Sequence, residues 1–253
     1  MLTHPLLESL KSLRCHGMYE ALQEQMAQED IHHLSFEERL GFLIERECIN
    51  RDNRKLSVLL RQAKLKMTAC LEDIDYSQDR GLSKAVIKQL SDCSWISRKQ
   101  NLLITGPTGT GKTYLACALA HGACRRGFSA RYLRMPRLFQ ALELARGDGS
   151  YSKLLISLQK TQLIILDDWG LAPMNEVQRR DLLEIMDDRH NQSSTIVTSQ
   201  LPVKLWHDAI GEATLGDAIL DRLIHNAHRI EIKGDESMRK KQAKQLNNIN
   251  ETN

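Results

Sequence analysis

A single glycine-rich loop limits the possible folds of this chain more than any other part of its sequence. Residues 106–113 read Gly-Pro-Thr-Gly-Thr-Gly-Lys-Thr and fit the pattern G-x-x-x-x-G-K-[ST] without deviation. Glycines let the backbone curl so that successive N–H groups point at phosphate oxygens, and a helix that begins near Lys112 adds the positive end of its dipole. We predict that Lys112 contacts the β- and γ-phosphates of a nucleotide and that the Thr113 hydroxyl binds Mg²⁺. The predicted nucleotide contacts are Gly106, Pro107, Thr108, Gly109, Thr110, Gly111, Lys112 and Thr113.

From residue 100 onward, short apolar runs alternate with helical patterns. Asn101–Thr105 precedes the loop, and a helix over Lys112–Arg126 follows it and is stopped by Gly127. Strands without polar alternation that are separated by helices predict a parallel sheet covered on both faces. The other predicted strands are Ala130–Met135, Gln162–Leu166, Ser194–Ser199 and His228–Lys233, with helices at Arg137–Arg146 and Asn175–His190 and two short helices before the last strand.

The first 75 residues or so have a different, entirely helical character. Leucines and methionines recur at helical spacing before residue 27, and Ser35 stands three residues before Glu38 in the capping-box pattern. This second helix is predicted to continue to about Met67, and residues 71–91 form a connecting stretch with Gly81 as its pivot. We expect a helical N-terminal domain over residues 1–78, an α/β domain over 79–240 and a flexible tail over 241–253.

Composition excludes several other classes of protein. The 42% hydrophobic content suffices for a core, and no run approaches the 18 apolar residues of a transmembrane helix. The first residues lack a signal-peptide pattern, and the six cysteines contain no CxxC pair, so we expect reduced thiols in a cytoplasmic protein without a zinc site. Because the net charge is only +3, any nucleic-acid surface must be a local patch.

Two acids follow a second apolar strand and complete the predicted nucleotide site. In Leu-Ile-Ile-Leu-Asp-Asp, residues 163–168, the strand is buried and its carboxyl end meets solvent beside the phosphate loop. Asp167 is predicted to hold Mg²⁺ through water, and Asp168 to orient or deprotonate the attacking water. Asp168 is one methylene shorter than the glutamate usual for this base, which predicts slow hydrolysis.

Two later segments supply candidate catalytic groups. The strand over residues 195–200 ends in hydroxyl and amide side chains, and we predict that Ser199, with Thr198 as the alternative, senses the γ-phosphate. Arg222 is predicted to enter a neighbouring subunit's site and neutralise transition-state charge. The competing interpretation is an intrahelical or surface ion pair among neighbours such as Asp217, Asp221 and Asn226, and Arg229 and Arg239 are lesser candidates for the same role.

The chain resembles the AAA+ family in its nucleotide motifs, in the late Asp221-Arg222-Leu223 and in much of its N-terminal sequence. More narrowly, the chain resembles the initiator and helicase-loader branch that includes DnaC, and within it IstB, the ATPase helper of insertion-sequence transposition. The resemblance implies a P-loop NTPase sheet flanked by helices, binding ATP with Mg²⁺. It also implies homo-oligomers that assemble with ATP on double-stranded DNA, remodel it and deliver it to a partner transposase. The family lacks a helical lid domain, and the roughly 20 residues after Lys233 are too few for one.

Basic residues near the end of the long N-terminal helix form the candidate DNA-binding surface. Arg54, Arg61 and Lys64 are spaced seven and three apart, so a helix would place them on one face that tracks phosphates. No base-reading motif accompanies them, which predicts weak sequence preference. A solvated charged face or a surface between subunits is the competing interpretation. The full candidate set is Arg54, Lys55, Arg61, Lys64 and Lys66, and Arg125 with Arg126 forms a second, smaller patch.

Four other functions compete with that of a DNA-bound ATPase of transposition. A replicative helicase loader shares the same nucleotide motifs but would bind a helicase and prefer single-stranded DNA. A small-molecule kinase would need an arginine-rich lid over the nucleotide, and no clear lid segment is present; a GTPase would need an Asn-Lys-x-Asp motif, which is absent. A nucleotide-gated scaffold that barely hydrolyses ATP stays open because of Asp168.

Overall fold

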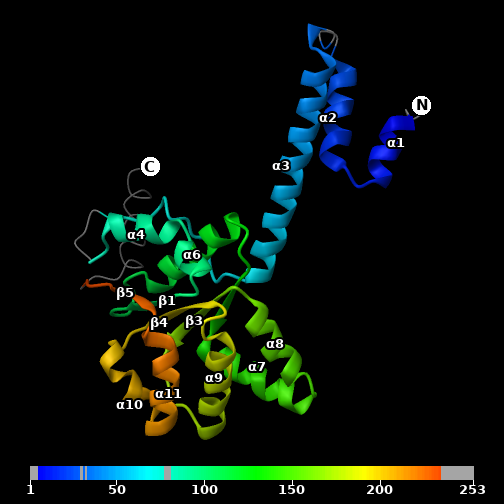
Figure 1. The fold of residues 1–253 in the computed structure, drawn as a ribbon. Coiled ribbons are helices and arrows are strands. Elements are labelled where there is room, and N and C mark those ends of the chain that lie inside the picture. The colour runs from blue at the N-terminus through cyan, green and yellow to red at the C-terminus, as the bar shows by residue number, and fades with distance from the viewer. Residues whose placement is uncertain (1–4, 29–30, 32, 77–80, 235–253) are drawn as a thin grey trace, which may run out of the picture. The chain divides into compact units, whose positions relative to one another are not determined.

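The computed structural model describes residues 5–28, 31, 33–76 and 81–234, in which helices and a single sheet form two compact units (Figure 1). One unit ends at Val58 and the other begins at Leu59, so this division falls inside a helix. The functional domain boundary near residue 78 stays a prediction. The predicted tail at 241–253 lies outside the described residues. The two units are described separately below.

The N-terminal unit is built from α1 (Pro5–Ser12), α2 (His16–Ala27) and the first part of α3 (Phe36–Ala63). Its small core contains Leu7, Ala21, Leu22 and Leu43. The predicted capping box is confirmed: the Glu38 amide donates to the Ser35 hydroxyl over 3.2 Å, and the Ser35 amide donates to the Glu38 carboxylate over 2.8 Å. Helix α3 ends at Ala63 and not near Met67, because Lys64 adopts a left-handed conformation with φ of 47°.

The second unit contains a five-stranded parallel sheet in the order β2-β3-β4-β1-β5. The three central strands are almost wholly buried, as their continuous apolar runs require, and the two edge strands are partly exposed. The parallel sheet predicted from sequence is thereby confirmed. The strands are β1 (Asn101–Thr105), β2 (Ala130–Arg134), β3 (Leu163–Trp169), β4 (Ser194–Ser199) and β5 (Ala227–Glu231).

Helices cover both faces of this sheet (Figure 1). On one face, α6 packs against β1, β2, β3 and β4, with α4 beside it. On the other, a large apolar cluster joins the sheet to helices α7 to α11 and includes the pair Trp169 and Trp206, whose rings are tilted by 35° with centroids 5.1 Å apart. The helices of this unit are α4 (Lys84–Ser91), α5 (Ser94–Ser97), α6 (Lys112–Arg125), α7 (Met135–Gly147), α8 (Tyr151–Lys160), α9 (Glu176–Arg189), α10 (Trp206–Ile210) and α11 (Ala213–Ile224), with a 3₁₀ turn at Val203–Leu205.

The structure contains three helices that the sequence analysis did not assign. Helices α4 and α5 lie within or next to the segment interpreted as a connector, and α8 fills the gap left after residue 150. Their apolar residues do recur at helical spacing, as in Leu155 and Leu158, but each helix is short and none carries a side-chain cap. Within the described residues, no helix is both long enough and apolar enough to span a membrane.

Candidate nucleotide-binding site

The glycine-rich loop lies between β1 and α6, at the carboxyl end of the sheet. Gly106 has a φ of 147°, and a Cβ added there would lie 2.2 Å from the Ile232 carbonyl oxygen. Gly111 precedes the first residue of α6 with a φ of 93°, a left-handed conformation that glycine adopts without strain. The loop can therefore present its amides together with the N-terminus of a 14-residue helix, the arrangement that binds phosphate groups.

The loop lysine is held inside the loop. The Lys112 ammonium donates to the carbonyl oxygens of Gly106 and Pro107 over 2.8 and 2.7 Å. Burial lowers the pKa of Lys112, and the negative charges of Asp167 and Asp168 oppose that shift. A phosphate group would offer the ammonium a charged acceptor in place of two neutral carbonyls, and charge-assisted hydrogen bonds are the stronger kind.

Asp167 is the most heavily hydrogen-bonded carboxylate of the site. It is 1% exposed and accepts hydrogen bonds from the hydroxyls of Thr113, at 2.9 Å, Tyr132 and Thr198. The Lys66 ammonium lies 3.5 Å from its Oδ2 atom. Burial alone would raise the pKa of Asp167, but the three hydroxyl donors and the Lys66 charge outweigh burial and lower it. The carboxylate therefore stays ionised in an almost fully buried position.

Asp168 occupies a different environment one residue further on. Its φ is 65°, and the pairing of β3 with β4 shifts register between Leu166 and Trp169, so the strand bulges at this point. The bulge directs the Asp168 side chain to Arg134 at the end of β2, whose Nε atom lies 2.6 Å from Oδ2. This hydrogen bond and the charge of Asp168 raise the pKa of Arg134.

A cavity of about 410 Å³ is lined by Lys112, Thr113, Asp167 and Asp168 among other residues. Such a volume is typical of small-molecule and cofactor sites. The loop, both acids and the end of β4 line one side, as the sequence predicts, but residues of the segment between α3 and α4 also line it. The sequence analysis missed that contribution, because this segment carries no nucleotide motif. Its lining residues are Lys66, Met67, Asp73, Ile74, Asp75 and Leu82.

The two candidate phosphate sensors on β4 have different surroundings. The Ser199 hydroxyl donates to the Trp169 carbonyl over 2.8 Å and accepts from the Leu201 amide over 3.0 Å, so it holds the end of β3 against the end of β4. The Thr198 hydroxyl donates to Asp167. Contact with the acid therefore belongs to the alternative, Thr198, and the sensor role of either residue stays a prediction.

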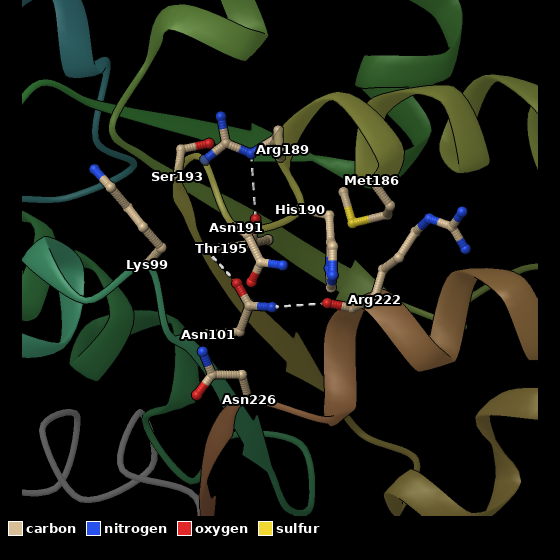
Figure 2. Close-up of a pocket in the computed structure, with 10 residues that line it drawn as sticks. All are labelled: Lys99, Asn101, Met186, Arg189, His190, Asn191, Ser193, Thr195, Arg222 and Asn226. Carbon is tan, nitrogen blue, oxygen red and sulfur yellow. Dashed lines mark hydrogen bonds between the residues drawn. The ribbon is translucent and has the colours of Figure 1, made fainter.

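Arg222 lies near the amino ends of the strands, whereas the phosphate loop follows their carboxyl ends. It lines a pocket at the amino ends of β1 and β4, where the Asn101 side chain donates to the Arg222 carbonyl and accepts from the Thr195 amide (Figure 2). The pocket volume of about 10 Å³ holds nothing larger than a water molecule. The Arg222 guanidinium pairs with Asp187 of α9 over 2.5 Å, an ion pair of the surface kind rather than one within its own helix. The role of Arg222 in a neighbouring subunit stays a prediction.

The basic residues predicted to form one DNA-binding surface have different positions in the structure. Arg54, Lys55 and Arg61 are exposed on α3, whereas Lys64 follows the end of the helix in a left-handed conformation. The helical spacing argument therefore fails for Lys64. Lys66 differs from the others, because it lines the cavity beside the glycine-rich loop and pairs with Asp167. Its contact with DNA stays a prediction. In the second patch, Arg125 pairs with Glu72 over 3.2 Å.

This fold and site define a P-loop nucleotide-binding protein of the AAA+ class. The chain belongs to the IstB-like ATP-binding protein family, whose model matches residues 8–246. A protein of Sinorhizobium fredii named as an insertion sequence ATP-binding protein is 52% identical over 242 residues, covering 96% of this chain and 98% of its own length. The corresponding IS21 protein of Pseudomonas aeruginosa is 31% identical over 230 residues and covers 91% of this chain and 86% of its own length.

Solved structures support the fold. The crystal structure of DnaI matches with a TM-score of 0.58 at 24% identity, covering 68% of this chain and all of the DnaI chain. The DnaC helicase loader matches with a TM-score of 0.54 at 22% identity, covering 68% of this chain and 97% of its own. These similarities concern the fold, and the AAA+ architecture predicted from the sequence motifs is confirmed.

Proposed function

We propose that this chain is the ATPase that assists transposition of an insertion sequence. In this role it assembles with ATP on double-stranded target DNA, remodels that DNA and delivers it to a partner transposase, and hydrolysis controls release. The observation that supports the ATPase part best is the convergence of the loop lysine, Thr113 and two acids on one cavity. The relatives named as insertion sequence ATP-binding proteins support the transposition context.

The residues of the site divide the work of ATP binding. The loop amides and Lys112 bind the β- and γ-phosphates once Lys112 leaves its own carbonyls. Thr113 and Asp167 suit Mg²⁺, because a hydroxyl and a buried, ionised carboxylate lie 2.9 Å apart and both supply oxygen. When bound there, Mg²⁺ would neutralise phosphate charge. Thr198 keeps Asp167 in place by its hydrogen bond.

Hydrolysis needs a group that orients and deprotonates water. Asp168 suits this role because its side chain is partly exposed, lines the cavity and stands next to the metal-binding acid. Its ion pair with Arg134 must loosen before Asp168 can accept a proton, and the short aspartate side chain adds to the distance that it must cover. Both features favour slow turnover that DNA or a partner stimulates. In this proposal Arg222 of a neighbouring subunit neutralises the charge that develops on the phosphates.

The DNA-binding part of the proposal relies on the exposed basic residues of α3 and on Lys64. Arg54, Lys55 and Arg61 present three positive charges along the last turns of one long helix, where they can contact phosphates without reading bases. The N-terminal helices are also the part of the chain proposed to contact the transposase. Cytoplasmic location follows from this role in the cell's DNA transactions.

Light scattering of the assembled protein tests the proposal most directly. Oligomer size is measured on double- and single-stranded DNA, with and without a slowly hydrolysed ATP analogue. We expect large assemblies only with nucleotide and duplex together, and Lys112→Ala should abolish them because the phosphates lose their main cation. Lys88→Ala, an exposed lysine on α4, is the matched control.

Other outcomes contradict specific parts of the proposal. Assembly on single strands alone would favour a helicase loader, and a nucleotide-bound monomer indifferent to DNA would favour a small-molecule kinase. Assembly of Lys112→Ala at the wild-type level would contradict the assignment of the phosphate loop.

A further inference from the structure

Lys66 is the residue whose position departs most from its sequence-based interpretation. It follows the last residue of α3 by three positions, yet its ammonium lies 3.5 Å from Asp167 Oδ2. Asp167 is almost fully buried, while 38% of the Lys66 side chain is exposed, so Lys66 approaches the acid from the cavity. The contact joins a group outside every recognised nucleotide motif to the acid proposed to hold the metal.

The backbone around Lys66 is anchored on α6. Leu65 and Met67 pack against a buried cluster that includes Cys117 and Ala118. Further along the segment, the Tyr114 hydroxyl donates to the Cys70 carbonyl over 3.3 Å. The backbone position of Lys66 is therefore set by packing on both sides of the residue, while its partly exposed side chain keeps the freedom to withdraw from the acid.

The charges around Asp167 leave Lys66 with a distinct role. The loop lysine, Lys112, donates to two backbone carbonyls, and Arg134 is paired with Asp168. Within the part of the chain that the structure describes, Lys66 is the cation that forms an ion pair with Asp167. A buried carboxylate without a positive partner would repel the phosphates of an incoming nucleotide.

We propose that Lys66 is the counter-ion of Asp167 when no divalent cation is bound, and that it competes with such a cation for this acid. The inference deepens the proposed nucleotide site and rests on it. Lys66 compensates the carboxylate in the metal-free state and becomes dispensable once Mg²⁺ is present. Lys66 therefore supports metal-free nucleotide binding and lowers the apparent affinity for Mg²⁺ by the same factor, because the two effects are thermodynamically linked.

Binding of a fluorescent ADP analogue, measured in EDTA and in saturating Mg²⁺, tests this role. Lys66→Met should weaken binding in EDTA by about fivefold, as expected for a partly exposed ion pair, and leave binding in Mg²⁺ unchanged. The midpoint of a Mg²⁺ titration at fixed nucleotide should fall by about the same factor. Lys66→Arg, which retains the charge, and Lys88→Met, which removes an exposed charge elsewhere, should both behave like the wild type.

Three outcomes overturn the inference. Unchanged binding in both conditions would remove Lys66 from the metal site, and equal weakening in both would make it a phosphate ligand instead. Lys66→Gln repeats the measurement with a polar neutral side chain, in case Lys66→Met does not fold. If the wild type itself bound no nucleotide under either condition, the proposed nucleotide site would be wrong as well. That result is distinct from a wild type that binds nucleotide but shows no effect of Lys66, which contradicts only the role of Lys66.

Discussion

At the scale of single residues, the adjacent acids Asp167 and Asp168 show how backbone geometry separates two chemical roles. Asp167 is a buried residue of β3 and accepts hydrogen bonds from several hydroxyls, which keep it ionised although it is buried. The bulge turns Asp168 away to the cavity and to Arg134. The same type of side chain is thus the acid proposed to hold the metal at one position and the proposed base at the next.

Replacing the proposed base tests this division. Asp168→Asn keeps the size of the side chain but cannot accept a proton from water, so nucleotide binding should persist while turnover falls about 10²-fold to 10⁴-fold. Phosphate release in the presence of duplex DNA measures turnover, and a fluorescent nucleotide measures binding. Asp208→Asn, at an exposed position on α10, should change neither. Unchanged turnover in Asp168→Asn would mean that another group activates the water.

At the scale of elements, helix α2 depends on a carboxylate from another helix. Glu47 of α3 is buried and accepts from the amides of Gly17 and Met18 over 2.7 and 3.2 Å, and from Arg51 over 2.7 Å. These amides belong to the first turn of α2, which has no side-chain cap of its own. Gly17 allows the close approach, since a Cβ there would lie 2.5 Å from the Arg46 carbonyl oxygen.

The contact predicts a specific dependence of stability on pH. Burial raises the pKa of Glu47, but the hydrogen bonds from Arg51, Met18 and Gly17 outweigh burial and lower it. A carboxyl with a lowered folded-state pKa stabilises the protein above the unfolded pKa of about 4.3, and this stabilisation is lost as the pH falls through the folded-state value. Glu47→Gln should therefore lower the free energy of unfolding by about 1–2 kcal/mol at pH 7.

Urea unfolding of the full chain between pH 3 and pH 7 checks that dependence. The difference between the wild type and Glu47→Gln should shrink toward zero as the medium becomes acidic, because Glu47 is then protonated in both states. Glu45→Gln makes the same change at an exposed position of α3 and should leave stability within about 0.5 kcal/mol. If the difference in unfolding free energy between the wild type and Glu47→Gln did not vary with pH, the lost stability would come from altered packing and not from the lost charge.

At the scale of the whole molecule, function is proposed to arise between copies of the chain. The guanidinium of Arg222 lies away from its own phosphate loop and pairs with Asp187. That placement is compatible with action on a neighbouring subunit, provided that the ion pair exchanges partners on assembly.

Mixing two inactive variants tests action between subunits. Arg222→Ala removes the arginine proposed to act on the neighbouring subunit, which is expected to lower turnover about 10³-fold or more. Asp168→Asn removes the proposed base. In mixed assemblies, the intact base of one variant can meet the intact arginine of the other, so part of the wild-type phosphate release should return. No recovery in assemblies shown to be mixed, by co-purification of the untagged variant with an affinity-tagged one, would place the two residues in one functional unit, or leave Arg222 a structural role.

The proposed DNA contact makes a prediction about salt. Neutralising Arg54, Arg61 and Lys64 together should weaken duplex binding and flatten its dependence on salt, with the slope of log K against log salt falling by up to about 3. Fluorescence anisotropy with labelled duplex at several salt concentrations measures both quantities. An unchanged slope would place the DNA contact elsewhere.

A charge-matched variant controls for net charge. Neutralising Lys88, Arg98 and Lys204 removes the same number of exposed positive charges at positions outside α3 and its end. This variant should keep the wild-type slope, because those side chains lie outside the candidate surface.

Local chemistry in the sequence determined the sheet, the phosphate loop and the two acids. The loop pattern needs particular residues at fixed spacing, and buried parallel strands need unbroken apolar runs, so the sequence alone predicts the positions of Gly106–Thr113, Asp167 and Asp168 in the fold. The capping box at Ser35 is local in the same way.

The tertiary structure alone decided which distant side chains surround those acids. Lys66 reads as one more charge of a basic helix, but a left-handed residue at position 64 ends that helix and packing on α6 brings the lysine to Asp167. Tyr132 and Arg134 reach the acids because β2 pairs with β3, a register that hydrophobic pattern does not specify. The difference is physical: backbone conformation and capping depend on neighbours in the chain, whereas partners of a buried charge depend on how separate elements pack.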